Sequence, residues 1–259
     1  MPLFRGKQPA VHDPRLPSAR RLLARATLEA LPAATNWRAA CAMVLMLGND
    51  RAGDCAFAAS LHFVGVITGN AGQPIVPDTA SALQNYARYT GYDIATGADD
   101  NGTVILDKNK RWMSDGLIIN QRAALDRLDG FAPIEPGDLA TLRHVIANFG
   151  GAELGLGMPA DAEDVFAAGR PWTDTSGAPS LGHDVCVVDF DGPDWFIIAT
   201  WDRYQRASSA WVRKYMEEGF ALLRRTWLRD NMRSPSGLTM AQLDEHIAEL
   251  GGVLGLGAT

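Results

Sequence analysis

A glycine-containing polar turn, residues 47–54, leads directly into an apolar run that begins at Cys55 in this 259-residue chain. The run from Cys55 to Ile67 is apolar on nearly all sides, which predicts a helix buried in the core. A thiol in the first turn of a helix lies near unsatisfied amides and the positive end of the helix dipole, and both favour the thiolate. The turn and helix therefore present Cys55 as a candidate nucleophile.

A second segment supplies a candidate base. His183 precedes an apolar run, residues 184–190, and a turn of Gly, Pro and Asp connects this run to another at residues 195–200. This pattern predicts a β-hairpin with His183 at its entrance. A cysteine and a histidine on remote segments are typical of thiol-dependent hydrolysis.

Composition narrows the classes of function. The net charge of −6 argues against nucleic acid as a partner. The three cysteines, Cys41, Cys55 and Cys186, have no paired spacing, so we expect neither a disulfide framework nor a metal site, and no cofactor. The first residues do not have the pattern of a signal peptide, and the apolar stretches are too short or too interrupted to span a membrane. We therefore expect synthesis in, and at least initial residence in, a bacterial cytoplasm.

The sequence predicts three regions: a proline-rich N-terminal arm at residues 1–35, a main domain at 36–232, and a C-terminal helix with a flexible tail at 233–259. The elements expected within them are helices at 19–31, 79–90, 122–128, 138–148, 209–227 and 243–250, strands at 116–119 and 152–158, and a surface loop at 93–112.

Two short segments carry a family resemblance. Gly53-Asp54-Cys55-Ala56-Phe57-Ala58 resembles the Gly-x-Cys-Trp-Ala-Phe box of the papain-like cysteine proteases, and Gly182-His183-Asp184-Val185 resembles their Gly-His-Ala-Val box. The resemblance covers roughly residues 36–220. It implies an α+β fold in which a helical subdomain bears Cys55 and an antiparallel β subdomain bears His183.

The resemblance also implies roles for individual residues. Cys55 corresponds to the nucleophile and His183 to the general base and acid, while Asn49 stands where the family has its oxyanion-hole glutamine. The family's asparagine that orients the imidazole falls on Ala199, which has no polar side chain. Thr200, Asp184 and Asp189 are the candidates for a replacement hydrogen bond to His183, and strand alternation does not decide between them.

Two functions follow. The segment from Met46 to Cys55 is similar to a box in proteins of tailed bacteriophages and prophages, which implies a virion or tail component, structural or adhesive, with a degenerate Cys-His site. Its partners would be other virion or tail proteins in an oligomeric assembly, and a host cell-surface polymer or peptide. The alternative is an active cysteine hydrolase, a peptidase or amidase, that uses Cys55 and His183.

Overall fold

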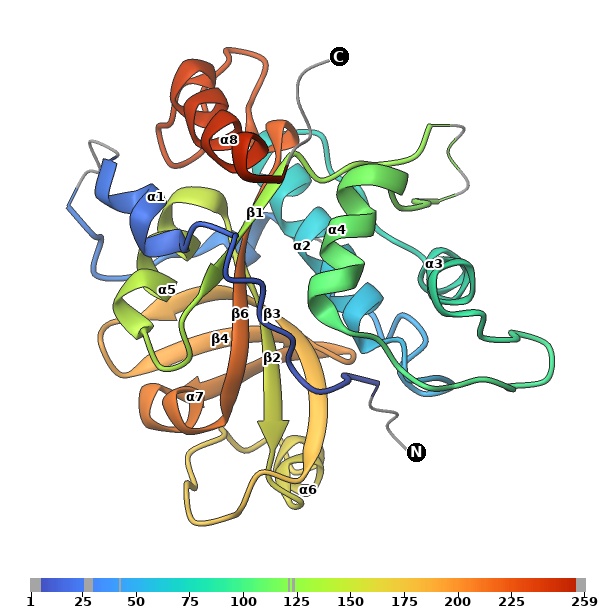
Figure 1. Cartoon of the computed structure of the whole chain (residues 1–259). Helices are drawn as coiled ribbons and strands as arrows, with labels where there is room; N and C mark the ends of the chain where they lie inside the picture. Colours follow the sequence, from blue (N-terminus) through green and yellow to red (C-terminus); the bar gives the residue numbers. More distant parts are fainter. Residues whose placement is uncertain (1–5, 26–29, 42, 121, 123, 255–259) are drawn as a thin grey trace.

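Six antiparallel strands form one sheet in the order β1-β6-β2-β3-β4-β5, with helices packed on both faces (Figure 1). This computed structural model describes residues 6–25, 30–41, 43–120, 122 and 124–254. The strands are β1 (Gly130–Ile134), β2 (Ala152–Met158), β3 (Leu181–Asp191), β4 (Trp195–Thr200), β5 (Arg203–Ser208) and β6 (Met216–Leu223).

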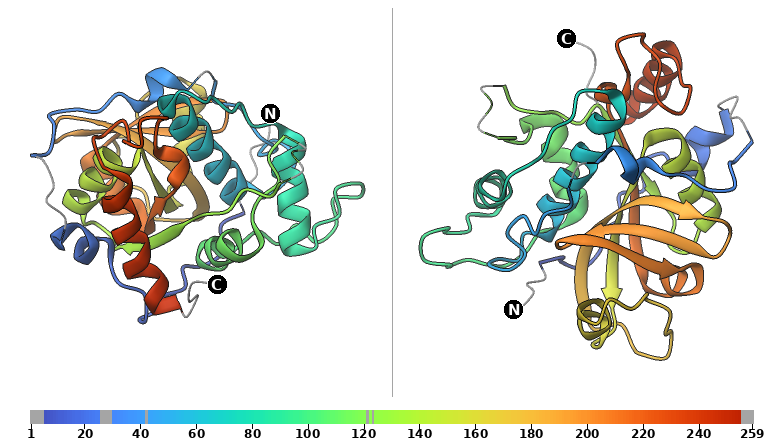
Figure 2. Two further views of the ribbon diagram at one scale, coloured as in Figure 1. Left: turned by 90° about the horizontal axis from the view of Figure 1, so that it is seen from above. Right: turned by 180° about the vertical axis from the view of Figure 1, so that it is seen from behind.

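The helices divide between the two faces of the sheet. In Figure 1, α2 (Cys55–Ala71), α3 (Thr79–Thr90) and α4 (Ile105–Asp115) lie to the right of the sheet, and α1 (Ala19–Arg25) and α5 (Leu139–Phe149) lie to its left. The views in Figure 2 show the same separation. The remaining helical elements are α6 (Ala162–Ala167), α7 (Ser209–Tyr215), α8 (Met240–Leu254) and the 3₁₀ turns η1 (Trp37–Ala40) and η2 (Arg225–Trp227).

Strand alternation supplies the two apolar cores that these helices cover. On β3, Val185 and Val187 belong to the core shared with α1, α5 and α7, whereas Cys186 and Val188 belong to the core shared with α2, α3 and α4. The mixture of helices with an antiparallel sheet confirms the predicted α+β class. In the part of the chain that is described, no helix combines the length and apolar character needed to cross a membrane.

Several predicted elements are confirmed at their ends. The Asp78 and Asp138 carboxylates accept hydrogen bonds from the amides of Ser81 and Thr141, which caps α3 and α5 as the sequence indicates. Helix α8 begins with a capping box between Thr239 and Gln242, and it continues past the predicted end at residue 250 to Leu254. Helix α1 is confirmed from Ala19 to Arg25, and residues 26–29 of that prediction lie outside the described residues.

The surface loop predicted at residues 93–112 is wrong in its second half, where α4 begins at Ile105. Helix α4 lacks the apolar periodicity from which helices are predicted, because two of its buried residues, Lys108 and Asn109, are polar. Lys108 forms a buried ion pair with Glu153 of β2, and the Asn109 amide donates to the same carboxylate over 2.7 Å. At this point of the core, a buried ion pair and an amide hydrogen bond connect α4 to β2.

The single helix predicted at residues 209–227 is also wrong, because α7 ends at Tyr215 and the chain continues as β6. Strand β6 lies between β1 and β2, so hydrogen bonds to both neighbours override the local helical pattern. The helix predicted at 122–128 is absent from its described part, where Asp126 instead pairs with Leu117 as a β-bridge. Strands β1 and β5 were not predicted.

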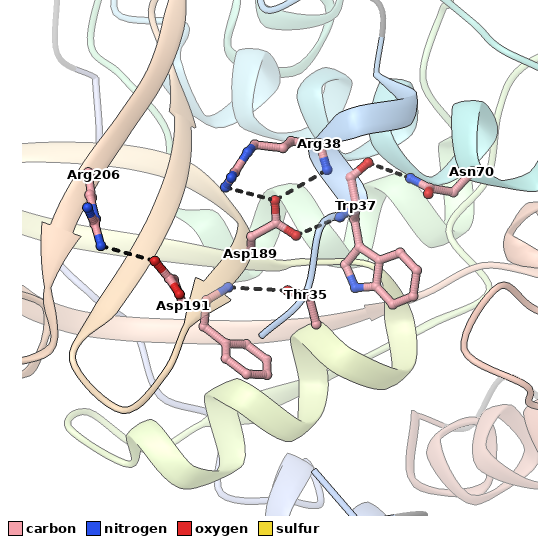
Figure 3. A network of polar contacts seen from close by, with 8 residues as sticks. Thr35, Trp37, Arg38, Asn70, Asp189, Asp191 and Arg206 are labelled. Atoms are coloured by element: carbon pink, nitrogen blue, oxygen red, sulfur yellow. Dashed lines mark hydrogen bonds and ion pairs between the residues drawn. The ribbon is translucent and has the colours of Figure 1, made fainter. Parts of the chain in front are cut away.

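A buried carboxylate fastens the segment at residues 35–38 to β3 (Figure 3). Asp189 accepts hydrogen bonds from the backbone amides of Trp37 and Arg38, at 2.6 and 3.3 Å, and lies 3.4 Å from the Arg38 guanidinium. The Asn70 amide of α2 donates to the Trp37 carbonyl over 2.7 Å. These contacts connect the segment that leads toward the Cys55 turn to both the sheet and α2.

Replacing Asp189 with alanine leaves two backbone donors without their acceptor, so we expect the free energy of unfolding to fall by about 3 kcal/mol. Asp191→Ala is the matched control, because Asp191 is exposed and pairs only with Arg206 in Figure 3, and it should change stability by less than about 0.5 kcal/mol. Urea denaturation of the two variants checks this. Equal losses in both would contradict a structural role for Asp189.

Candidate active site at the start of helix α2

The turn before α2 is shaped to bring Cys55 to the sheet. Leu47 and Gly48 adopt left-handed backbone conformations, with φ of 52° and 102°. A Cβ atom at Gly48 would lie 2.3 Å from the buried Asp54 carboxylate, so this position requires glycine. Asp54 immediately precedes α2, and Cys55 is the first residue of the helix, as the sequence predicts.

The thiol of Cys55 lies beside the first part of β3. The backbone amide of Asp184 donates to the Cys55 sulfur over 3.4 Å, so the peptide unit that joins His183 to Asp184 is directly against the thiol. The His183 side chain is fully buried. The two residues that the sequence singled out, 128 positions apart in the chain, are therefore brought to one place.

Thr200 holds the imidazole of His183. The Nε2 atom of His183 lies 2.8 Å from Thr200 Oγ1, and the ring stacks on Trp201 at a centroid distance of 4.8 Å. Trp201 has φ of 50°, an uncommon conformation for a large side chain, in the turn that follows β4. Of the candidates for a replacement hydrogen bond to His183, Thr200 makes it. The Asp189 carboxylate instead accepts from the amides of residues 37 and 38.

Asn49 is buried in the turn that precedes Cys55, and its amide group is used within this turn. Its Nδ2 atom lies 3.2 Å from the Met46 carbonyl and 3.2 Å from the Asp54 carboxylate. Both amide hydrogens thus have acceptors that stabilise the turn. A role for Asn49 as an oxyanion donor stays a prediction.

The surroundings of Cys55 favour the neutral thiol. Burial, and next the nearby Asp184 carboxyl, raise the pKa of Cys55 to about 12, while hydrogen bonds from the Asp184 and Gly6 amides oppose the shift. The expectation that the helix terminus favours the thiolate is therefore wrong for this conformation, because burial outweighs the helix dipole. This burial depends in part on the N-terminal arm.

Residues 6–8 of the arm cover the thiol. The Gly6 amide donates to the Cys55 sulfur over 3.4 Å, and residues 6–8 pair with Thr103 through two backbone hydrogen bonds of 2.6 and 3.0 Å. In Figure 1 this dark-blue segment passes between the helices on the right and the strands on the left. The place of the arm in the site could not be predicted from the sequence, because nothing in the composition of the arm indicates where it binds.

Backbone contacts seat the arm closely. A Cβ atom at Gly6 would lie 1.6 Å from the Gly53 carbonyl oxygen, and one at Gly102 would lie 2.1 Å from the Gly6 carbonyl oxygen. The loop that carries Gly102 is anchored by Asp100, whose carboxylate accepts from the Gly53 amide and the Tyr86 hydroxyl. Asp100 lies in the segment predicted as a surface loop, residues 93–112, and no role in the site was predicted for it.

Among the described residues, no group of three His, Cys, Asp or Glu side chains is arranged to hold a metal ion. The three cysteines are free.

Comparison with known proteins identifies the fold. No protein-family profile and no curated protein sequence matches this chain. Among solved structures, xylellain, a cysteine protease from Xylella fastidiosa, matches with a TM-score of 0.65 at 16% identity, over 85% of this chain and 96% of that one.

Two further solved structures agree. Digestive procathepsin L 3 of Tenebrio molitor larval midgut matches with a TM-score of 0.58 at 15% identity, over 85% of this chain and 75% of that one. The Carica candamarcensis cysteine protease CMS1MS2, in complex with E-64, matches with a TM-score of 0.55 at 15% identity, over 74% of this chain and 98% of that one. The chain therefore has the fold of the papain-like cysteine proteases.

Proposed function

We propose that this protein is a cysteine hydrolase that acts on peptide or amide bonds, with Cys55 as nucleophile and His183 as general base and then acid. The observation that carries the proposal is the joint placement of the two residues. The Cys55 sulfur accepts from the amide that follows His183, and the His183 ring is held by Thr200 and Trp201. An imidazole fixed in this way is what a thiol needs for activation.

The proposed reaction has two steps. With Nε2 held by Thr200, Nδ1 of His183 takes the Cys55 proton, the thiolate attacks the substrate carbonyl, and the imidazolium returns the proton to the departing amine. Water then attacks the acyl-thioester and gives up its proton to His183, and the acid is released with the thiol restored. The backbone amide of Cys55, in the first turn of α2, is the proposed oxyanion donor. Asn49 is a second donor only when its amide exchanges the Met46 carbonyl or the Asp54 carboxylate for the substrate oxygen.

In the conformation described, residues 6–8 block this reaction. Gly6 occupies the space against the sulfur, and the high pKa of Cys55 keeps the nucleophile protonated. We propose that the arm must leave the cleft before substrate binds. This makes the enzyme latent, which differs from a degenerate site because the residues themselves remain in place.

A virion or tail component is the first of the two functions predicted from the sequence, with the hydrolase as its alternative, and nothing in the comparisons supports it. None of the three solved structures named above is described as a phage or virion protein. Virion association, an oligomeric assembly and a host-surface ligand all stay predictions.

The raised pKa of Cys55 predicts the pH dependence of its alkylation in the intact chain. The thiol is neutral below its pKa and only the thiolate reacts, so the rate with iodoacetamide should rise about tenfold per pH unit from pH 7 to 9. Mass spectrometry of the Cys55 peptide measures the rate. A plateau within this range would show that the thiolate already forms near neutral pH, contrary to the buried state.

Gly6→Val should expel the arm from the cleft, because even a Cβ atom at this position collides with the Gly53 carbonyl. We expect alkylation of Cys55 at pH 7.5 to become at least about tenfold faster, and thiol-dependent cleavage of peptide substrates to appear. Val11→Ile, at a position of the same arm that is 48% exposed, is the matched control and should change neither.

Cys55→Ala in the Gly6→Val background should abolish the cleavage. If the Gly6→Val chain alkylates quickly at Cys55 yet hydrolyses no peptide or amide in a broad substrate panel, the hydrolase proposal is wrong.

Thr200→Val should lower kcat about tenfold in the opened chain with little change in KM, because it removes the hydroxyl that positions His183 and leaves substrate contacts intact. Thr200→Ser keeps the hydroxyl and should retain most of the activity. Steady-state kinetics on both variants checks this. Equal activity of the valine and serine variants would exclude the positioning role.

A further inference from the structure

The side chain of Lys7 enters the interior beside the nucleophile. Its ammonium group lies 2.7 Å from a Glu217 carboxylate oxygen and 3.4 Å from one of Glu218, and it donates to the Gln8 carbonyl over 3.2 Å. The Lys7 side chain is only 1% exposed. Two of the three donors of the ammonium group thus have hydrogen-bond acceptors, and the Glu218 carboxylate is close enough for an ion pair. The group is bound as a ligand would be.

Two glycines of β2 provide the space for this side chain. A Cβ atom at Gly155 would lie 2.4 Å from Lys7 Cε, and one at Gly157 would lie 2.2 Å from the Glu217 carboxylate. The side chain of Ile105 closes the same space, 2.8 Å from the Cβ position of Gly155. A cavity of about 400 Å³ adjoins it, with Lys7, Gly157, Gly182 and Glu217 in its lining. The pocket is thus built into the sheet and opens to a cleft.

The walls of this pocket carry more carboxyl groups than the fold neutralises. Gly155 stands opposite Asp184 on β3 and opposite Glu218 on β6, and Glu153 precedes it on the same face of β2. Asp184 is 2% exposed, and neither of its carboxyl oxygens has a hydrogen-bond partner among the described residues. Lys108 pairs with Glu153, and Lys7 is the cation that the arm contributes.

The pKa values of Glu218 and Asp184 are both raised, as expected for carboxyl groups buried close to other carboxyl groups. Burial raises the pKa of Glu218 to about 7, although Lys7 acts to lower it. Burial and the Glu153 carboxylate raise the pKa of Asp184 well above its usual range. If the arm departs, the pocket loses an ammonium group and keeps every carboxyl, so a proton or another cation takes the place of the Lys7 charge.

We propose that this pocket is a substrate subsite selective for a lysine side chain, and that Lys7 occupies it while the arm is bound. The inference rests on the proposed hydrolase function and specifies the substrate class of that site. A substrate lysine would place its ammonium between Glu217 and Glu218 and its methylene stem along Gly155. The peptide backbone would then lie where Gly6 now contacts the Cys55 sulfur.

The geometry favours lysine over arginine. The acceptors converge on one nitrogen atom, as a compact ammonium requires, whereas a guanidinium needs acceptors in a planar, side-by-side arrangement. The stem is confined by Gly155 and Ile105, so a longer and wider head group would displace Glu218.

The test uses the full-length Gly6→Val chain and fluorogenic peptides that differ only in lysine, arginine or norleucine at each position around the cleaved bond. We expect kcat/KM to be about tenfold higher for lysine than for norleucine at one position, which corresponds to one charge-assisted interaction. Glu218→Gln should reduce this preference to within about twofold. Glu217→Gln should reduce the lysine preference partly, and the fold should tolerate this change more easily because Glu217 is half-exposed. Glu135→Gln is the control: Glu135 is exposed directly after β1, and its replacement should leave the lysine preference unchanged.

The outcomes separate the two proposals. Cleavage without a lysine preference, or with a preference that both glutamate variants leave intact, would overturn the subsite while the hydrolase proposal stands. Absence of all cleavage would overturn the hydrolase proposal, and binding then decides the subsite. In the Gly6→Val, Cys55→Ala chain, fluorescence anisotropy should show tighter binding of a labelled lysine peptide than of its norleucine counterpart, and equal affinities would overturn the subsite.

Discussion

One buried ammonium group, that of Lys108, holds the two halves of this protein together. It belongs to α4, donates to the Ser60 hydroxyl of α2 over 2.7 Å, and pairs with Glu153 of β2. Because both charges are almost completely buried, removing one partner would strand the other in a medium that solvates it poorly. The pair therefore fixes where α4 meets β2 and, through Ser60, where α4 meets α2.

Much of the fold could be predicted because the signals were local. The caps at Asp78 and Asp138, the hairpin of β3 and β4, and the buried helix α2 follow from apolar periodicity and turn chemistry within a few residues. The elements that were missed depend on partners far along the chain. Helix α4 turns polar groups inward to reach Glu153, and β6 becomes a strand because it lies between β1 and β2.

The candidate site was predictable in its residues and less so in its arrangement. The boxes around Cys55 and His183 lead to two side chains that the fold brings together, but the spacing rule that points to Ala199 misses Thr200 one residue later. Trp201, the residue after Thr200, has a left-handed backbone conformation, and its indole stacks on the same imidazole that Thr200 contacts at Nε2. Gly6 and Lys7 had no signal in the sequence, since their roles exist only where the arm meets the cleft.

The covalent link between the arm and the cleft sets a concentration scale for this protein. A ligand tethered by a short chain faces its site at an effective concentration of about millimolar, however dilute the protein is. On the proposed function, a free substrate would compete with Lys7 against that fixed value, so dilution and protein abundance would not change the balance. The arm would then be displaced from the cleft only by substrate at a comparable concentration or after cleavage of the chain between the arm and the main domain. Peptides present at much lower concentrations would leave it bound.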